Sequence, residues 1–360
     1  MTPAQFIAAL PKAELHMHIE GSIEPELFLQ LAERNQVQIR WQDVDALRAA
    51  YDFKDLQSFL DLYYDGCRVL VTAQDFHDVT RAYLQRAHAD GVIHCELFLG
   101  PQAHMSRAVA VSTMLDGVLS AMQAAKRDNG LSSGLILSAQ RHRSEAEAFS
   151  MFEQVVPWAE HLLGFGLGGA EVGNPPSKFA RFFAHCRAQG FRVVVHAGEE
   201  GPASYVREAV ELLQVDRIDH GNACVTDASL MRALAASQLP LTVCPLSNLR
   251  LKVSDNLATH ALPRFMEAGL CVTLNSDDPS FFGGYINDNF LQCQQAYDWS
   301  PSQLVQLARN SLVASFLPDS ERQAAMARLD AFAAVAPSCT RLIRARIMPA
   351  GFRCWMTLRP

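Results

Sequence analysis

The chain has 360 residues, of which 49% are hydrophobic and 19% are charged, and its formal net charge is −7 at pH 7. This length gives a large buried core and suits one large α/β barrel or two ordinary domains. The lack of a basic excess argues against nucleic acid or an anionic membrane as a partner, and no run of about 18 apolar residues predicts a spanning helix.

The cysteines and the N-terminal segment indicate the cellular compartment. Nine cysteines are scattered along the chain and never spaced CxxC. This favours reduced thiols in a cytoplasmic protein over a disulfide framework or a thiolate zinc site. Residues 1–10 lack a charged region followed by an apolar one. We therefore expect a short amphipathic helix there and not a signal peptide.

Strand and helix patterns alternate along the rest of the chain. A first strand is expected at residues 13–18, and apolar residues three and four apart predict helices over 24–91. This insert is long for a β–α connection, so we expect a helical lid over a pocket, at about 24–90. Later strands are expected at 92–98, 134–138, 164–168, 191–196, 217–220, 241–244 and 270–275, and later helices at 110–126, 145–163, 177–189, 204–213, 227–237 and 262–268.

Eight apolar strands that alternate with helices predict the fold class. Such strands are typical of a parallel sheet covered on both faces, and eight of them favour closure as a single (β/α)8 TIM barrel of the α/β class. We assign residues 1–335 to this domain. Residues 336–360 form a basic C-terminal tail, with five arginines and no acid between Arg341 and Arg359, which we expect to be poorly ordered.

Polar side chains mark the ends of four predicted strands. His16 and His18 are separated by one residue, so both face the same side of their strand. His196, His220 and the pair Asp277-Asp278 end three later strands. The carboxyl ends of barrel strands form the active-site face. Alone, each feature has a structural alternative, such as a core histidine or a helix cap. Together they indicate a metal centre.

Three neutral histidines and one carboxylate suit Zn²⁺, one ion per chain, with iron or manganese as alternatives. The expected ligands are His16, His18, His196 and Asp277. Zinc lowers the pKa of bound water toward about 7, which gives hydroxide at neutral pH. Glu199 follows His196 by three residues and is the candidate general acid/base. The alternative for Glu199 is an exposed carboxylate at a helix start.

At this point five segments resemble the adenosine/adenine deaminase family of the amidohydrolase superfamily. They are Pro11–Gly21 (PKAELHMHIEG), His196–Gly201 (HAGEEG), Arg217–Gly221 (RIDHG), Cys244–Asn248 (CPLSN) and Asn275–Pro279 (NSDDP). The resemblance implies a (β/α)8 barrel that hydrolyses the purine C6 amino group to ammonia.

Carried over by position, the resemblance implies a role for each motif residue. His16, His18, His196 and Asp277 would bind zinc, Glu199 would protonate purine N1, His220 would orient the attacking hydroxide, Asp278 would contact N7, and the Gly169 amide would reach N3.

Glu20 bears on the choice of substrate. Adenosine-specific relatives typically have aspartate at this position, in contact with ribose, and the longer glutamate would intrude into ribose space. Phe281–Asn287 and Val172–Phe179 also resemble the adenine deaminases, so we expect adenine to be converted to hypoxanthine in purine salvage. Gly100 and Asn174 depart from the pattern. A pocket enlarged at Gly100 predicts N6-substituted adenines as alternative substrates, and adenosine stays a further alternative.

Several other patterns are weaker indications of a functional site. Residues 164–169 match GxGxxG without the helix that a dinucleotide site needs, and His18-Ile19-Glu20 lacks the PCxxC of cytidine-type deaminases. The paired aspartates suggest two metals, but no lysine ends a strand where a bridging carbamate would form. A purine-binding barrel without turnover, a hydrolase of another C–N bond, and assembly as a homo-oligomer stay open.

Overall fold

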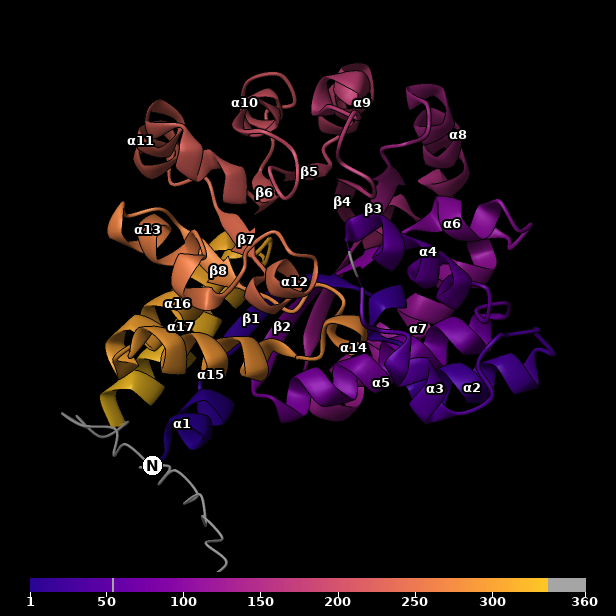
Figure 1. Cartoon of the computed structure of the whole chain (residues 1–360), viewed down its shortest axis with the longest axis horizontal. Helices are drawn as coiled ribbons and strands as arrows, with labels where there is room; N and C mark the ends of the chain where they lie inside the picture. Colours follow the sequence, from indigo (N-terminus) through magenta and orange to yellow (C-terminus); the bar gives the residue numbers. More distant parts are fainter. Residues whose placement is uncertain (54, 336–360) are drawn as a thin grey trace, which may run out of the picture.

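The computed structural model describes residues 1–53 and 55–335. Eight parallel strands lie at its centre and pair in chain order, with helices arranged around them (Figure 1). The strands are β1 (Lys12–His18), β2 (Val92–Leu99), β3 (Ser132–Gln140), β4 (Leu162–Gly168), β5 (Arg192–Ala197), β6 (Arg217–His220), β7 (Leu241–Val243) and β8 (Val272–Leu274). All eight strands predicted from the sequence are present.

The backbone of Asp277 closes the barrel between the last strand and the first. Its N–H donates to the carbonyl of His16 at 3.0 Å, and its carbonyl accepts from the N–H of His18 at 2.9 Å. The same contact forms a parallel bridge between Met17 and Asp277. The predicted (β/α)8 barrel is confirmed. The two segments that meet where it closes carry His16, His18 and Asp277, which are three of the four expected metal ligands.

The helices bury their apolar faces against the outside of this sheet. They are α1 (Pro3–Ala9), α2 (Pro25–Arg34), α3 (Val44–Ala49), α4 (Leu56–Cys67), α5 (Ala73–Ala89), α6 (Pro101–Met105), α7 (Val111–Asn129), α8 (Glu145–Val155), α9 (Ala180–Ala188), α10 (Ala203–Glu211), α11 (Ala228–Ser237), α12 (Pro245–Arg250), α13 (Leu262–Glu267), α14 (Pro279–Phe282), α15 (Ile286–Tyr297), α16 (Pro301–Ala314) and α17 (Asp319–Val335). Short 3₁₀ turns are η1 (Glu20–Ser22), η2 (Val156–His161), η3 (Pro176–Phe179), η4 (Asn222–Thr226) and η5 (Leu257–Thr259). No helix within the described ranges has the length and apolarity needed to span a bilayer.

The insert after β1 contains helices of two kinds. Helix α5 packs against α7 and β2, as an ordinary barrel helix does. Helix α4 instead lines a pocket at the carboxyl end of the barrel with Phe59, Leu60, Tyr63 and Tyr64. The structure therefore assigns the pocket-facing part of the insert to α4. Movement of this segment as a lid stays a prediction, and residues 336–360 lie outside the described residues.

Several boundaries differ from those expected, and the difference at the end of α8 is the most informative. The helix predicted over 145–163 ends at Val155, because a 3₁₀ turn that contains Pro157 follows from Val156, and β4 starts at Leu162. Helix α12 and the helices after β8 were not assigned from the sequence. Inside the barrel, Phe98, Ile136 and Val194 form a small apolar cluster with Phe316.

Candidate metal centre and active site

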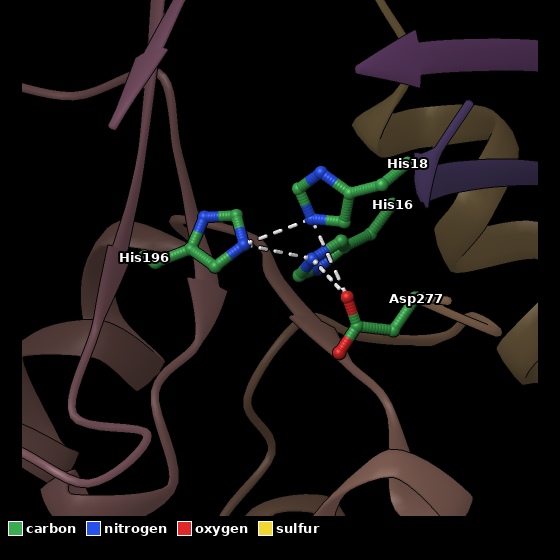
Figure 2. Close-up of side chains that lie close together, drawn as sticks. All are labelled: His16, His18, His196 and Asp277. Carbon is green, nitrogen blue, oxygen red and sulfur yellow. Dashed lines mark hydrogen bonds and ion pairs between the residues drawn. The ribbon is translucent and has the colours of Figure 1, made fainter. Parts of the chain in front are cut away.

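Four expected metal ligands meet at the carboxyl ends of β1 and β5 and just after β8 (Figure 2). Nε2 of His196 lies 3.1 Å from Nε2 of His16 and 3.2 Å from Nε2 of His18. Oδ1 of Asp277 lies 3.4 Å from Nε2 of each β1 histidine. Bonds of about 2.0–2.1 Å in a tetrahedral zinc site separate neighbouring ligand atoms by about 3.3–3.4 Å. The donor set therefore fits one small first-row ion.

The outer nitrogens of His16 and His196 face acceptors that hold these two rings in place. Nδ1 of His16 lies 3.0 Å from Oγ1 of Thr242, and Nδ1 of His196 lies 3.1 Å from Oδ2 of Asp219. Thr242 in turn donates to Asp219 at 2.8 Å. A proton on Nδ1 leaves the Nε2 lone pair free for an ion, which is the usual arrangement behind metal-binding histidines.

The electrostatics of the cluster also favour a cation. Burial lowers the pKa of His18 to about 4, so its ring is neutral at physiological pH. Burial opposes a charge on His16 as well, yet Asp219 and Asp277 raise its pKa above the ordinary value. Although burial acts in the opposite direction, His16 holds the pKa of Asp277 well below its usual range. Two carboxylates around one buried ring thus favour a positive charge at this place.

Glu199 and His220 lie beside the expected ligands. Nε2 of His220 is 3.6 Å from Oε2 of Glu199 and 3.8 Å from Oδ2 of Asp277. Burial, followed by repulsion from Asp277 and Glu171, raises the pKa of Glu199 well above its ordinary value. A carboxyl group whose pKa is raised in this way is suited to act as a general acid.

Two residues of the site adopt an unusual backbone conformation. His220 and Asp277 have φ angles of +66° and +64°, in the left-handed region that side chains other than glycine rarely occupy. Each such residue costs of order 1–3 kcal/mol and persists only where its surroundings impose it. His220 is the last residue of β6 and Asp277 lies three residues after β8, and at both places the left-handed turn directs the side chain over the barrel mouth.

The expected substrate residues surround one pocket. Glu199, His220, Asp278 and Gly169 line this pocket together with His18 and the apolar residues of α4. Gly169 has a φ of +94°, which only glycine adopts readily. Burial and the neighbouring Asp277 raise the pKa of Asp278 well above its usual range, which favours a protonated carboxyl. A Cβ at Gly21 would lie 1.8 Å from Oδ1 of Asp278, so a glycine is required there.

Glu20 lies behind Gly100 at the edge of this pocket. Its Oε1 accepts from the Gly100 N–H at 2.9 Å and lies 3.0 Å from Nε2 of His104. Although burial opposes the charge, His104 lowers the pKa of Glu20. Its Oε2 is buried and has no hydrogen-bond partner among the described residues. Glu20 thus offers one free acceptor held in a fixed position.

The sequence analysis missed several residues that support the site. Glu171 accepts from the N–H groups of Gly198, Glu200 and Gly201 at 2.7, 2.9 and 2.8 Å, and so fixes the loop that carries Glu199. Ser247 donates to Oδ2 of Asp277 at 2.7 Å. Glu171 is in the segment that contains Gly169, and Ser247 is in the CPLSN motif. The sequence signal that could have identified these two residues was a carboxylate or a hydroxyl inside a segment already assigned to the site.

A family model described as adenosine deaminase matches residues 11–332. The chain belongs to the adenosine deaminase family. The adenine deaminase of Rhodopseudomonas palustris (strain BisB18) is 57% identical over 329 residues, which cover 91% of this chain and 96% of the relative. That of Ralstonia nicotianae is 53% identical, over 89% of this chain and 94% of the relative.

Solved structures agree with this membership. The crystal structure of adenine deaminase from Arthrobacter aurescens superposes with a TM-score of 0.89 at 48% identity, over 91% of this chain and 100% of that one. An amidohydrolase from Burkholderia ambifaria, described with bound Zn, gives a TM-score of 0.85 at 27% identity, over 92% and 93% of the two chains. The family resemblance seen in the motifs is confirmed.

Proposed function

We propose that this member of the family is an adenine deaminase, which converts adenine and water to hypoxanthine and ammonia. The observation that carries the proposal is a cluster of four metal-competent groups next to a buried acid, Glu199, at one pocket. The relatives named above, at 48–57% identity over nearly the whole chain, support the same reaction. The buried cysteines, none of them in a disulfide among the described residues, favour a cytoplasmic enzyme.

We assign His16, His18, His196 and Asp277 to hold one Zn²⁺. The donor spacings and the negative field around His16 support this assignment, as does the zinc in the Burkholderia ambifaria amidohydrolase. A divalent ion held there would supply the acidified water of a metal hydrolase, with a pKa lowered toward about 7.

The protein groups activate the purine ring. C6 of a purine is a poor electrophile, and protonation of N1 draws electrons away from it. Glu199 is the proton donor to N1, because its carboxyl is buried, has a raised pKa and lies at the pocket wall. His220 orients the water that adds to C6. The resulting charge collects where a donor is already placed, which is the general basis of electrostatic catalysis.

Recognition of the other ring atoms follows from hydrogen-bond polarity. N7 and N3 of adenine are acceptors and need donors. A protonated Asp278 supplies a donor for N7, and the Gly169 amide supplies one for N3. Both groups line the pocket. The aromatic and aliphatic side chains of α4, such as Phe59 and Leu60, cover the ring and exclude water.

Glu20 favours the free base over the nucleoside. Adenine carries a hydrogen on a ring nitrogen of its five-membered ring, and Oε2 of Glu20 is a buried acceptor without a partner. Adenosine has a ribose at N9 and no hydrogen there, so it would leave this oxygen unsatisfied. The space at Gly100 adjoins Glu20, since a Cβ at residue 100 would lie 3.5 Å from Oε1 of Glu20. N6-substituted adenines and adenosine are therefore the alternatives that the experiment must include.

The test is ammonia release by the purified, zinc-loaded enzyme. Adenine, adenosine, N6-methyladenine and N6-isopentenyladenine are compared, each with and without a chelator. We expect turnover of adenine that the chelator abolishes, and a loss of about 10²–10⁴-fold in Glu199→Gln. The matched control is Glu200→Gln, the next residue, which is exposed and is assigned no catalytic role. Absence of turnover with all four compounds, or unchanged turnover in Glu199→Gln, would contradict the proposal.

A further inference from the structure

A line of hydrogen-bonded side chains leads from α13 to the back of His220. The N–H of Leu262 donates to Nδ1 of His260 at 3.0 Å, and Nε2 of His260 lies 3.0 Å from Oδ1 of Asn248. Nδ2 of Asn248 lies 3.4 Å from Nδ1 of His220. Asn248 is fully buried and His260 is 3% exposed, so water does not compete for these contacts.

The first link fixes the direction of all the others. A backbone N–H can only donate, so Nδ1 of His260 is an acceptor and carries no proton. Burial lowers the pKa of His260 to about 4, and its neutral ring therefore has the proton on Nε2. That proton faces the amide of Asn248, whose oxygen must point toward His260. The NH₂ group of Asn248 then points toward Nδ1 of His220.

The other side of the His220 ring agrees with this direction. Nδ1 faces a donor, so it is an acceptor without a proton. Nε2 lies 3.8 Å from Oδ2 of the Asp277 carboxylate and 3.6 Å from Oε2 of the Glu199 carboxyl, and it has no hydrogen-bond partner among the described residues. The His16 and His196 rings, with centroids at 4.7 and 5.1 Å, and the Cys244 thiol, within 4.8 Å, also lie beside His220. A proton on Nε2 therefore fits these surroundings, because it leaves a donor that points toward the reaction centre and is not used by the described residues.

We propose that His260 and Asn248 are positioning residues that set the tautomer of His220, with its proton on Nε2, the nitrogen that faces the reaction centre. In this tautomer His220 offers a hydrogen-bond donor to the attacking water and does not act as its base. The inference deepens the proposed function, because the role of His220 in turnover depends on it. The hydrogen-bond relay itself depends only on the contacts above.

The test is ¹⁵N NMR of the zinc-loaded protein labelled at histidine. Long-range proton–nitrogen spectra distinguish a ring nitrogen that carries a proton from one that does not, and His220→Gln identifies the signals of His220. We expect a protonated Nε2 and an unprotonated Nδ1. A proton on Nδ1 of His220 in the wild-type protein would overturn the proposal, whatever the variants do.

Three variants at two positions test the relay. Asn248→Asp is isosteric but presents acceptors to both neighbours, so the proton of His220 should move to Nδ1. The kcat for adenine should then fall by about 10²-fold with little change in KM, because loss of one positioned donor costs about 10²–10³-fold. His260→Leu should have the same effect in weaker form, and His260→Gln, which keeps a donor, should restore activity. An unchanged tautomer in Asn248→Asp would also overturn the proposal.

The matched control is His94→Gln. His94 is as buried as His260, at 4% exposure, and it also binds neighbouring side chains, Ser132 and Glu96, but it lies outside the candidate site. We expect neither the His220 signals nor kcat to change. The spectra are recorded whether or not adenine reacts. A wild-type protein with the expected tautomer but no turnover would contradict the proposed function alone.

Discussion

Glu171 offers the sharpest test of how the site is held in place. Its Oε1 accepts from the Gly198 N–H, and its Oε2 accepts from the N–H groups of Glu200 and Gly201, on both sides of Glu199. Glu171→Gln keeps the shape of the side chain but replaces one oxygen by an NH₂ group. In its less costly orientation the amide loses the Gly198 bond, and in the other orientation it loses two bonds.

The magnitude follows from the number of bonds lost. A hydrogen bond to a charged group contributes about 1.5–3 kcal/mol, and Glu171 is only 1% exposed, so water cannot replace the lost partner. We expect the free energy of unfolding to fall by about 2–3 kcal/mol. The loop should also shift, and a displacement of about 1 Å at a reacting group costs about 10²-fold in rate.

The assay combines urea unfolding with steady-state kinetics on adenine. We expect kcat to fall by about 10²-fold in Glu171→Gln while KM changes little. The control is Glu147→Gln, because Glu147 accepts from a backbone N–H at 2.9 Å in a similar way but its side chain is 47% exposed. Glu147→Gln should lose less than about 1 kcal/mol and keep its activity. A destabilised Glu171→Gln with wild-type kcat would refute the positioning role.

Three further predictions concern buried polar groups. Asp219→Asn, which alters the support behind His196 at 3.1 Å, should weaken zinc affinity by about 10–100-fold in a competition titration, and unchanged affinity would contradict that role. Arg217→Met leaves Glu96 buried without its partner at 2.6 Å, so urea unfolding should show a loss of about 3–5 kcal/mol, and a loss below about 1 kcal/mol would be inconsistent with this reasoning. Lys12→Met removes the donor to the carbonyls of Ile7, Leu10 and Asp90, and it should destabilise the protein by about 2–4 kcal/mol without lowering kcat. A Lys12→Met protein as stable as wild type would show that these carbonyls find other partners.

Local patterns in the sequence were sufficient for the barrel. Parallel strands buried on both faces need apolar residues, and amphipathic helices repeat at 3.6 residues, so both are visible within a few residues. Even the short strand β6, at Arg217–His220, was placed with its correct ends. The helix expected to reach residue 163 stopped earlier, because Pro157 favours a new turn over continuation of α8.

The sequence by itself determined which chemical groups stand at the strand ends, because the end of a strand is a local feature. His16, His18, His196 and Asp277 could be named as one set on that basis. Only the tertiary structure decided what holds them and their neighbours. Glu171 reaches backbone amides 27–30 residues away, and the Asp277 backbone closes the barrel on a strand some 260 residues earlier. Such partners carry no periodic signal, since their hydrogen bonds depend on distances that exist only once the barrel has closed.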